Sequence, residues 1–223
     1  GWGHPWSYNW RGLDHPPTLP ASGPYQIGSA TGVYYYDFPN FPESHRRTFF
    51  FSDYGTRTVF CYRPRWDGAL LQNVGDEMEL FARAGKALFS PTDVVAGPDG
   101  ALYFCEVDTG RTRRMDLGTG RLTTTAGNGE AAYAGDGGPA LAASFSKPHE
   151  IRFDRNGHLF VVERDAHVVR RVDAQTGLVS TVAGTGEAGF SGDGGPAVEA
   201  QLRQPHSIAF VGNGDLLIGD IWN

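Results

Sequence analysis

Histidines and carboxylates recur at a fixed spacing in this sequence. Two prolines are each followed by a histidine, at His149 and His206, which are 57 residues apart. An acid recurs with the same spacing, at Glu106, Glu163 and Asp220. Imidazole and carboxylate groups are ligands of divalent cations, so a zinc or calcium site is one interpretation if folding brings these side chains together. Thr92 stands one period before His149, so a third ligand would have to come from another unit.

Each of these side chains also has a structural interpretation. The recurring acid could accept backbone N–H bonds where a strand ends, and each histidine could hydrogen-bond a neighbouring unit. Arg164 departs from the repeat, and its guanidinium could hold an anionic ligand. The sequence leaves these alternatives open.

Two glycine-rich loops carry one aspartate each, Asp136 in the loop 135–140 and Asp193 in the loop 192–197. Calcium binds about six to eight oxygen atoms, so a single carboxylate favours a loop stabilised by its glycines over a calcium site. The recurring Arg-Arg pairs at 113–114 and 170–171 are expected to form ion pairs with acids.

All of these residues belong to one repeat with a period of 57. Most of the stretch from Thr125 to Asp173 recurs, and a fixed period of this kind indicates a repeat architecture. Each unit predicts four short strands, and the second is apolar throughout, as at 159–162, which implies burial on both faces. Asp-Gly or Asn-Gly pairs at 99–100, 156–157 and 213–214 predict two-residue hairpin turns with positive φ at both positions.

Four consecutive antiparallel strands with a buried second strand describe one blade of a β-propeller, so the predicted fold class is all-β. We expect an irregular, aromatic and proline-rich segment at 1–24, followed by propeller blades over 25–223. The blades are predicted at about 25–83, 90–126 and 148–183, with a partial blade at 205–223. About three and a half blades do not close a ring, since propellers have about 4–8. The chain is therefore expected to be part of a larger propeller, whose open blade edge would favour self-association.

The propeller arrangement predicts where the candidate side chains lie. The first strand of each blade lines the central channel, and residues before it and after the second strand share one face. His149 and His206 are thus expected on one channel rim, in adjacent blades. The other residues expected on this rim are Glu106, Glu163, Arg164 and Asp220.

The segment from Pro148 to Asp173 resembles an NHL repeat through its Asn-Gly turn, its acid at Glu163 and its Val-Val-Arg-Arg-Val-Asp ending. The copy at 205–223 does so in part, and the resemblance covers about 90–223. It implies a six-bladed β-propeller. The loop at 190–197 is typical of bacterial extracytoplasmic NHL proteins, which implies a periplasmic or secreted location. NHL-type amidating lyases are similar in using channel histidines for zinc, and His149 and His206 are at the matching positions.

The front part of the chain is similar to the later blades of pyrroloquinoline-quinone-dependent sugar dehydrogenases. The similarity lies in 38–55, in Pro91–Val94 and in the Gly-Pro-Asp-Gly-Ala-Leu-Tyr run at 97–103. The blades that hold that family's catalytic histidine and most of its quinone ligands have no counterpart in this sequence. The resemblance therefore supplies no catalytic residue, and the quinone is a weaker expectation than zinc or calcium.

The composition limits the classes of partner. The 223-residue chain has a formal net charge of −6, with acids and bases interspersed, which disfavours nucleic acid and anionic membranes. The sequence contains no run of about 18 apolar residues, so it predicts no membrane-spanning helix. Cys61 and Cys105 are too few for a disulfide framework, and are interpreted either as two buried inert thiols or as one bridge.

Two functions agree with these observations. The first is an extracytoplasmic binding module that holds a small polar ligand or a protein at its channel rim. The second is an enzyme that uses a metal or a quinone to act on a sugar or similar small polar substrate. The sequence favours the first, because no complete catalytic set is visible in it.

Overall fold

The computed structural model describes residues 30–36, 43–63, 65–67, 70–72, 78–83 and 89–223. The irregular segment predicted at 1–24 lies outside these ranges. The described part is almost entirely β-structure, with two single-turn 3-10 helices, η1 (Glu43–His45) and η2 (Ala197–Glu199).

Three four-stranded antiparallel sheets follow one another along the chain. The first contains β1 (Ala30–Tyr36), β2 (Thr48–Asp53), β3 (Thr58–Tyr62) and β6 (Met78–Arg83). The second contains β7 (Pro91–Ala96), β8 (Leu102–Glu106), β9 (Arg111–Met115) and β10 (Leu122–Ala126). The third contains β11 (Pro148–Phe153), β12 (Leu159–Glu163), β13 (Val168–Val172) and β14 (Val179–Ala183).

Two hairpins complete the described strands. The strands β15 (Pro205–Phe210) and β16 (Leu216–Asp220) pair with each other after the third sheet. A small hairpin of β4 (Arg65–Asp67) and β5 (Leu70–Gln72) lies between β3 and β6 in the chain.

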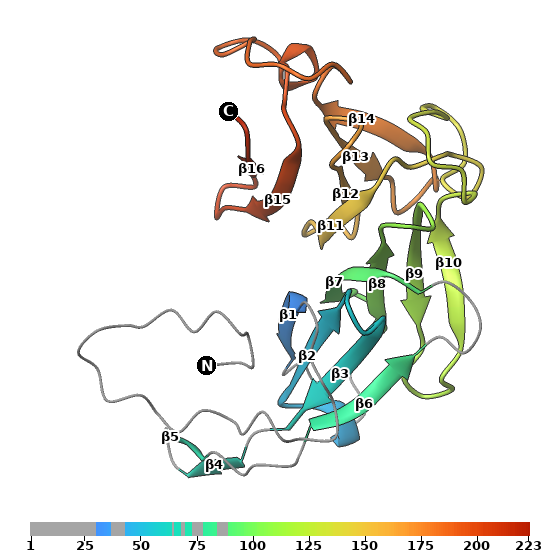
Figure 1. Cartoon of the computed structure of the whole chain (residues 1–223), viewed down its shortest axis with the longest axis vertical. Helices are drawn as coiled ribbons and strands as arrows, with labels where there is room; N and C mark the ends of the chain where they lie inside the picture. The colour runs from blue at the N-terminus through green and yellow to red at the C-terminus, as the bar shows by residue number, and fades with distance from the viewer. Residues whose placement is uncertain (1–29, 37–42, 64, 68–69, 73–77, 84–88) are drawn as a thin grey trace.

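The sheets stand side by side around an arc (Figure 1). The first strand of each sheet, β1, β7, β11 or β15, lies on the inner side of the arc, and β6, β10 and β14 lie on the outer side. This arrangement of four-stranded antiparallel sheets confirms the predicted fold class. None of the helices in the described ranges could cross a membrane.

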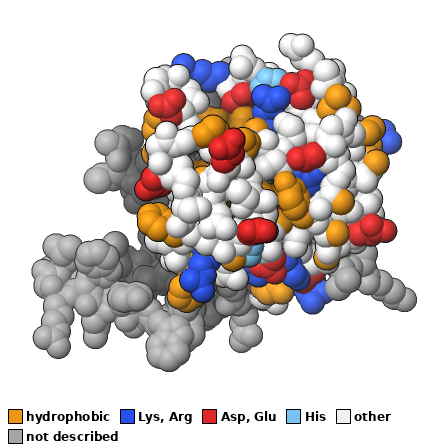
Figure 2. All heavy atoms as spheres, turned by 90° about the horizontal axis from the view of Figure 1, so that it is seen from above, with side chains coloured by type: hydrophobic (Ala, Val, Ile, Leu, Met, Phe, Trp, Pro, Cys, Tyr) orange, Lys and Arg blue, Asp and Glu red, His pale blue; other side chains and the backbone are white. Residues whose placement is uncertain are grey.

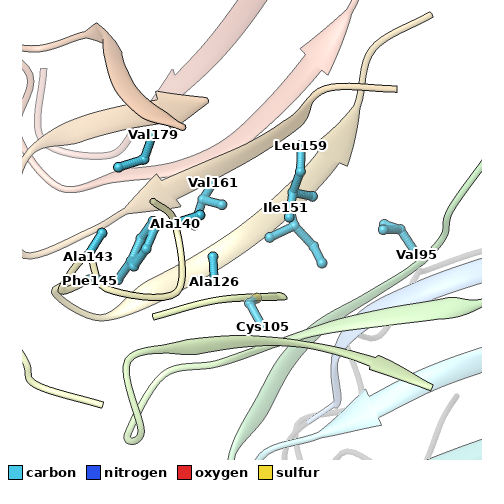
Figure 3. Packing of buried hydrophobic residues seen from close by; sticks show 10 residues of the cluster. All are labelled: Val95, Cys105, Ala126, Ala140, Ala143, Phe145, Ile151, Leu159, Val161 and Val179. Carbon is cyan, nitrogen blue, oxygen red and sulfur yellow. The ribbon is translucent and has the colours of Figure 1, made fainter. Parts of the chain in front are cut away.

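The core lies between adjacent sheets. One cluster joins the second sheet to the third (Figure 3), and it contains Cys105, Phe145, Ile151 and Val161, all fully buried. Every residue of β12 is buried, as its unbroken apolar sequence predicted. Burying a side chain such as Ile or Phe contributes about 1.5–3 kcal/mol to folding, so these contacts hold neighbouring sheets together.

The hairpin turns differ from the prediction. Only the glycine of each pair has positive φ, 76° at Gly100 and 82° at Gly157. The last paired residues are Phe153 and Leu159, so the connection contains five residues and not two. The Asp154 carboxylate accepts the N–H groups of Asn156 and His158, at 2.9 and 2.8 Å. These bonds stabilise the longer turn and leave Asn156 in an ordinary conformation.

Cys61 and Cys105 are both buried and neither forms a disulfide, which confirms the interpretation as two separate thiols. Burial raises the pKa of the Cys105 thiol well above its ordinary value. The outer surface carries acidic, basic and apolar side chains mixed together, as the view from above in Figure 2 illustrates.

Candidate functional site

A β-bulge at the start of each inner strand presents one side chain. The register shifts between Pro148 and Glu150 in β11 and between Pro205 and Ser207 in β15. The same shift occurs at the start of β1 and β7. A bulge leaves one residue outside the regular pairing and turns its side chain away from the ladder. The residues in these four bulges are Thr31, Thr92, His149 and His206.

The bulge side chains link each blade to the next. Thr31 donates its hydroxyl to the carbonyl of Pro91, and Thr92 donates to the carbonyl of Pro148, both at 3.3 Å. Nδ1 of His149 lies 3.2 Å from the carbonyl oxygen of His206. A carbonyl oxygen only accepts, so Nδ1 of His149 carries the proton. This hydrogen bond agrees with the structural interpretation of His149, and Nε2 is the ring nitrogen that keeps a lone pair.

His149 and His206 form a close pair of imidazoles. Their ring centroids are 3.5 Å apart, with a tilt of 46° between the ring planes. Burial and the neighbouring His206 lower the pKa of His149 to about 4. Burial and the charge of Arg164 lower the pKa of His206. Both rings are therefore neutral at pH 7, and the pair offers nitrogen acceptors and not positive charge.

The recurring acid is buried in the second and third sheets, where Glu106 and Glu163 accept hydrogen bonds from protein groups. Glu163 is fully buried, and it accepts the backbone N–H of Ser146 at 2.6 Å and Nη1 of Arg170 at 3.0 Å. Glu106 is 1% exposed and accepts the hydroxyl of Thr109 at 2.7 Å. These bonds agree with the structural interpretation of the acid, and they occupy both carboxylates with protein partners.

Two further candidate rim residues, Asp220 and Arg164, are partly exposed to solvent. Asp220 is partly exposed and accepts the backbone N–H of Arg203 with both carboxylate oxygens, at 3.0 and 2.8 Å. Arg164 is about one-third exposed, and its Nε donates to Asp165 at 2.9 Å. Since its charge acts on the pKa of both histidines, Arg164 belongs to the same group of side chains as His149 and His206.

The described residues do not complete a metal site. No three His, Cys, Asp or Glu side chains among them are placed to hold one ion. Zinc in proteins usually has three or four protein ligands, and the paired histidines supply two. The carboxylate of the first aspartate loop binds protein groups, because Asp136 pairs with Arg170 at 2.7 Å and accepts the Thr181 hydroxyl at 2.7 Å. The expected ion pairs of the arginine repeats are thus present at Arg170, and also between Arg113 and Glu106.

Sequence reasoning overlooked a second acid that recurs. Asp93, in β7, accepts the backbone N–H of Ile151 at 3.0 Å and pairs with Arg152 at 2.6 Å. Glu150, one period later, accepts the N–H of Ile208 at 3.0 Å. Burial raises the pKa of Asp93 to about 6, against the opposing charge of Arg152. The 57-residue spacing between Asp93 and Glu150 could have identified this position. Both acids directly follow the bulge residue of an inner strand, and both bind the next blade.

The histidine pair predicts a dependence of stability on pH. The folded protein disfavours protonated His149, whose pKa falls from 6.5 to about 4, so the unfolded chain binds more protons between these values. The contribution of His149 to the free energy of unfolding should therefore fall as pH decreases from 6.5 toward 4, opposite in sign to that of Asp93, so it is measured as the difference between the wild type and a His149 variant. The contribution is on the order of 1–2 kcal/mol, after allowing for the partial exposure of the ring.

This prediction is checked by urea denaturation at several pH values between 7 and 4.5. His149→Gln keeps an N–H donor for the His206 carbonyl but does not titrate, so it should remove this contribution. His158→Gln lies away from the pair and serves as the control. An unchanged slope in His149→Gln would contradict the assignment.

Comparisons with known proteins agree with this architecture. No protein-family model matches the chain. NHL repeat-containing protein 2 from Gallus gallus is 29% identical over 104 residues, which is 43% of this chain and 14% of that protein. Teneurin-3 from Mus musculus is 34% identical over 108 residues, which is 43% of this chain and 4% of that protein. The chain thus spans a small part of these curated relatives.

Solved structures share the fold over most of the chain. A Bacteroides thetaiotaomicron protein of unknown function has a TM-score of 0.68 at 19% identity, covering 88% of this chain and 47% of its own. An auxiliary nutrient binding protein from the same organism has a TM-score of 0.61 at 19% identity, and the match covers 86% of this chain and 45% of that protein. Virginiamycin B lyase from Staphylococcus aureus has a TM-score of 0.53 at 12% identity, and the match covers 87% of this chain and 50% of that protein.

These likenesses concern the fold, and the chain spans about half the length of each of these structures. Together with the recurring strands, the bulged inner strands and the match to an NHL repeat-containing protein, they lead to one conclusion. The described part of this chain has a β-propeller fold, and part of the chain is similar in sequence to an NHL repeat-containing protein.

Proposed function

We propose that this chain is an extracytoplasmic binding module that takes up a small polar ligand, or a polar segment of a protein, at the rim formed by His149, His206 and Arg164. The observation that carries the proposal is the pair of neutral imidazoles, with ring centroids 3.5 Å apart, beside a partly exposed arginine. The protein named an auxiliary nutrient binding protein supports a ligand-binding role for a propeller of this shape.

The chemistry of the three side chains selects a class of ligand. Arg164 presents N–H donors and a positive charge, which favour a carboxylate, a phosphate or a set of hydroxyl groups. The neutral imidazoles accept hydrogen bonds from hydroxyl groups and stack on a flat or apolar face. A hydroxylated anion, such as a sugar acid, would use both kinds of group. The net charge of −6 does not favour nucleic acid as the ligand.

The test is calorimetric titration with a panel of sugars, sugar acids and hydroxy acids. A ligand from this panel should bind with saturation. Arg164→Gln should weaken binding about tenfold or more, since a charge-assisted hydrogen bond contributes about 1.5–3 kcal/mol. His206→Ala should weaken it by up to about tenfold, since a hydrogen bond between neutral groups contributes about 0.5–1.5 kcal/mol. Arg121→Gln removes an exposed arginine near the turn before β10 and is the matched control. Equal affinity in Arg164→Gln and Arg121→Gln would reject this rim as the site.

The second candidate is a metal- or quinone-dependent enzyme, and the paired histidines favour a metal for it. It requires a ligand beyond His149 and His206, since the described residues supply only two. Stoichiometric zinc or calcium that disappears in the double variant His149→Ala, His206→Ala would support the enzyme over the binding module. Dye-linked sugar oxidation after addition of the quinone would support the quinone version.

A further inference from the structure

The inner edge of β11 is covered by two side chains. The N–H and C=O groups of one residue in a strand point toward the same side, and both of these groups of Ile151 bind side chains. The N–H donates to Asp93 at 3.0 Å, and the carbonyl accepts a bond from Nη1 of Arg152 at 2.6 Å. Because β11 is the first strand of its sheet and pairs with β12 along its other edge, both side chains lie on the inner side of the arc (Figure 1).

Arg152 lies between two carboxylates. Its Nη1 is 2.6 Å from Oδ2 of Asp93, and its Nη2 is 3.0 Å from Oε1 of Glu150. The same Glu150 oxygen accepts the N–H of Ile208 at 3.0 Å, so Glu150 lies along the inner edge of β15. Asp93, Arg152 and Glu150 therefore form one row across the inner edges of two neighbouring strands, which we call the inner row. It contains two acids and one cation.

Part of the hydrogen-bonding capacity of the inner row is unused. Within the described ranges, Oδ1 of Asp93, Oε2 of Glu150 and Nε of Arg152 have no hydrogen-bond partner. None of these atoms is buried without a partner, so solvent reaches each of them. The Arg152 side chain is 34% exposed. The inner row thus offers a donor between two acceptors to a molecule on the inner side of the arc.

The arginine of the inner row is not needed to cover a strand edge. Glu150 binds the N–H of Ile208, although the residue equivalent to Arg152 in β15 is Ala209. The equivalent residue in β7 is Val95. Arg152 therefore departs from the repeat at a position where the fold itself accepts a small or apolar side chain. Such departures from a structural pattern are expected at functional sites.

The surroundings of the inner row belong to the described part of the chain. The inner strands on both sides of β11, β7 and β15, are present there and contact it. Along β11, Arg152 follows His149 by three residues, a distance of about 10 Å at the usual rise of a strand. Arg164 directly follows Glu163, which pairs with Pro148 at the start of β11. The rim and the inner row therefore lie at successive depths of the same blade.

We infer that the inner row binds the hydroxyl groups of a sugar acid whose carboxylate is held by Arg164 at the rim. A hydroxyl group both donates and accepts hydrogen bonds, so neighbouring hydroxyls of a sugar match a donor that lies between two acceptors. The excess negative charge of the inner row repels a carboxylate, which orients the ligand with its acid toward Arg164. The inference rests on the proposed function, and it adds the residues that select a hydroxylated acid over an apolar one.

The test compares three carboxylates: glucuronate, galacturonate and cyclohexanecarboxylate, which has the same ring size and the acid but no hydroxyl groups. NMR titration measures all three affinities, weak ones included. At least one of the two sugar acids should bind about tenfold or more tightly than cyclohexanecarboxylate, because an apolar ring would leave the polar groups of the inner row without partners. We call this ratio of affinities the hydroxyl preference.

Two substitutions in the inner row make the test specific. Glu150→Gln keeps an oxygen for the N–H of Ile208 but removes the charge, and Arg152→Lys keeps a positive charge beside Asp93 but removes the planar set of donors. Each should lower the hydroxyl preference about fivefold to tenfold and leave the affinity for cyclohexanecarboxylate unchanged. Glu187→Gln removes an exposed acid elsewhere and is the matched control. The two variants are independent, so the test stands if urea denaturation shows that one of them does not fold.

The outcomes separate this inference from the proposed function. A hydroxyl preference that both variants retain, while Arg164→Gln weakens the binding of every probe, would overturn the inference and leave the rim as the ligand site. An equal loss of affinity for all three carboxylates would also overturn it, since the inner row would then only support the structure. If the wild type binds none of the probes with saturation, both the inference and the proposed sugar-acid ligand are wrong.

Discussion

Replacing Arg170 with methionine is expected to lower the free energy of unfolding by about 3–5 kcal/mol, as removal of one partner of a buried ion pair does. The guanidinium is fully buried and binds two carboxylates and two backbone carbonyls. Without it, Glu163 remains in a fully buried position with a single backbone donor. The loop that carries Asp136 also loses its attachment to β13.

Urea denaturation followed by fluorescence measures the change. Arg171→Met is the matched control, because that arginine is 38% exposed and lies 3.9 Å from Asp173, so its loss should cost under about 1 kcal/mol. Arg170→Met combined with Glu163→Gln should recover part of the loss, since the second change removes the unpaired charge. A loss below about 1 kcal/mol in Arg170→Met would show that the loop is held by its backbone bonds alone.

Phe104→Ala is expected to destabilise the protein by about 3–5 kcal/mol, the cost of truncating a fully buried aromatic residue. Phe104 has no exposed surface and packs between the first two sheets with Phe50, Val59 and Val94. The ring of Phe89 meets it edge-on, with centroids 6.2 Å apart. The side chains around it belong to two sheets, so the cavity left by the ring would weaken the contact between blades.

The control for this prediction is Phe190→Ala, which truncates the same side chain where it is 72% exposed. Its effect on the free energy of unfolding should lie within about 0.5 kcal/mol. Similar losses in the two variants would mean that the packing between the first two sheets does not limit stability. Guanidinium denaturation of both variants, compared through midpoint and slope, separates these results.

The sequence by itself determined the strands and their order. The 57-residue period predicted four strands for each unit, and the apolar run at 159–162 predicted that β12 is buried throughout. These features depend on local patterns, because the alternation of turn residues and apolar segments limits the chain to a few backbone arrangements. The ion pairs of the repeated arginines could also be predicted, since a buried guanidinium must meet an acid.

The turns and the candidate site depended on tertiary structure. Asn-Gly and Asp-Gly predicted two-residue hairpins, but Asp154 binds two N–H groups of the turn and stabilises a five-residue connection. That alternative is visible only when the strand register is known. Likewise, the sequence placed an acid after each second strand but did not determine whether Glu163 would face the channel or be enclosed.

A repeat gives equivalent residues the same local backbone, but their surroundings come from the next blade. His149 reaches the His206 carbonyl because a bulge turns it toward the neighbouring strand, and Thr92 makes the corresponding bond with a hydroxyl. Asp136 binds an arginine from β13, while Asp193, its equivalent one period later, is exposed. The period therefore determined which side chains are equivalent, and only the packing of one blade on another decided what each of them contacts.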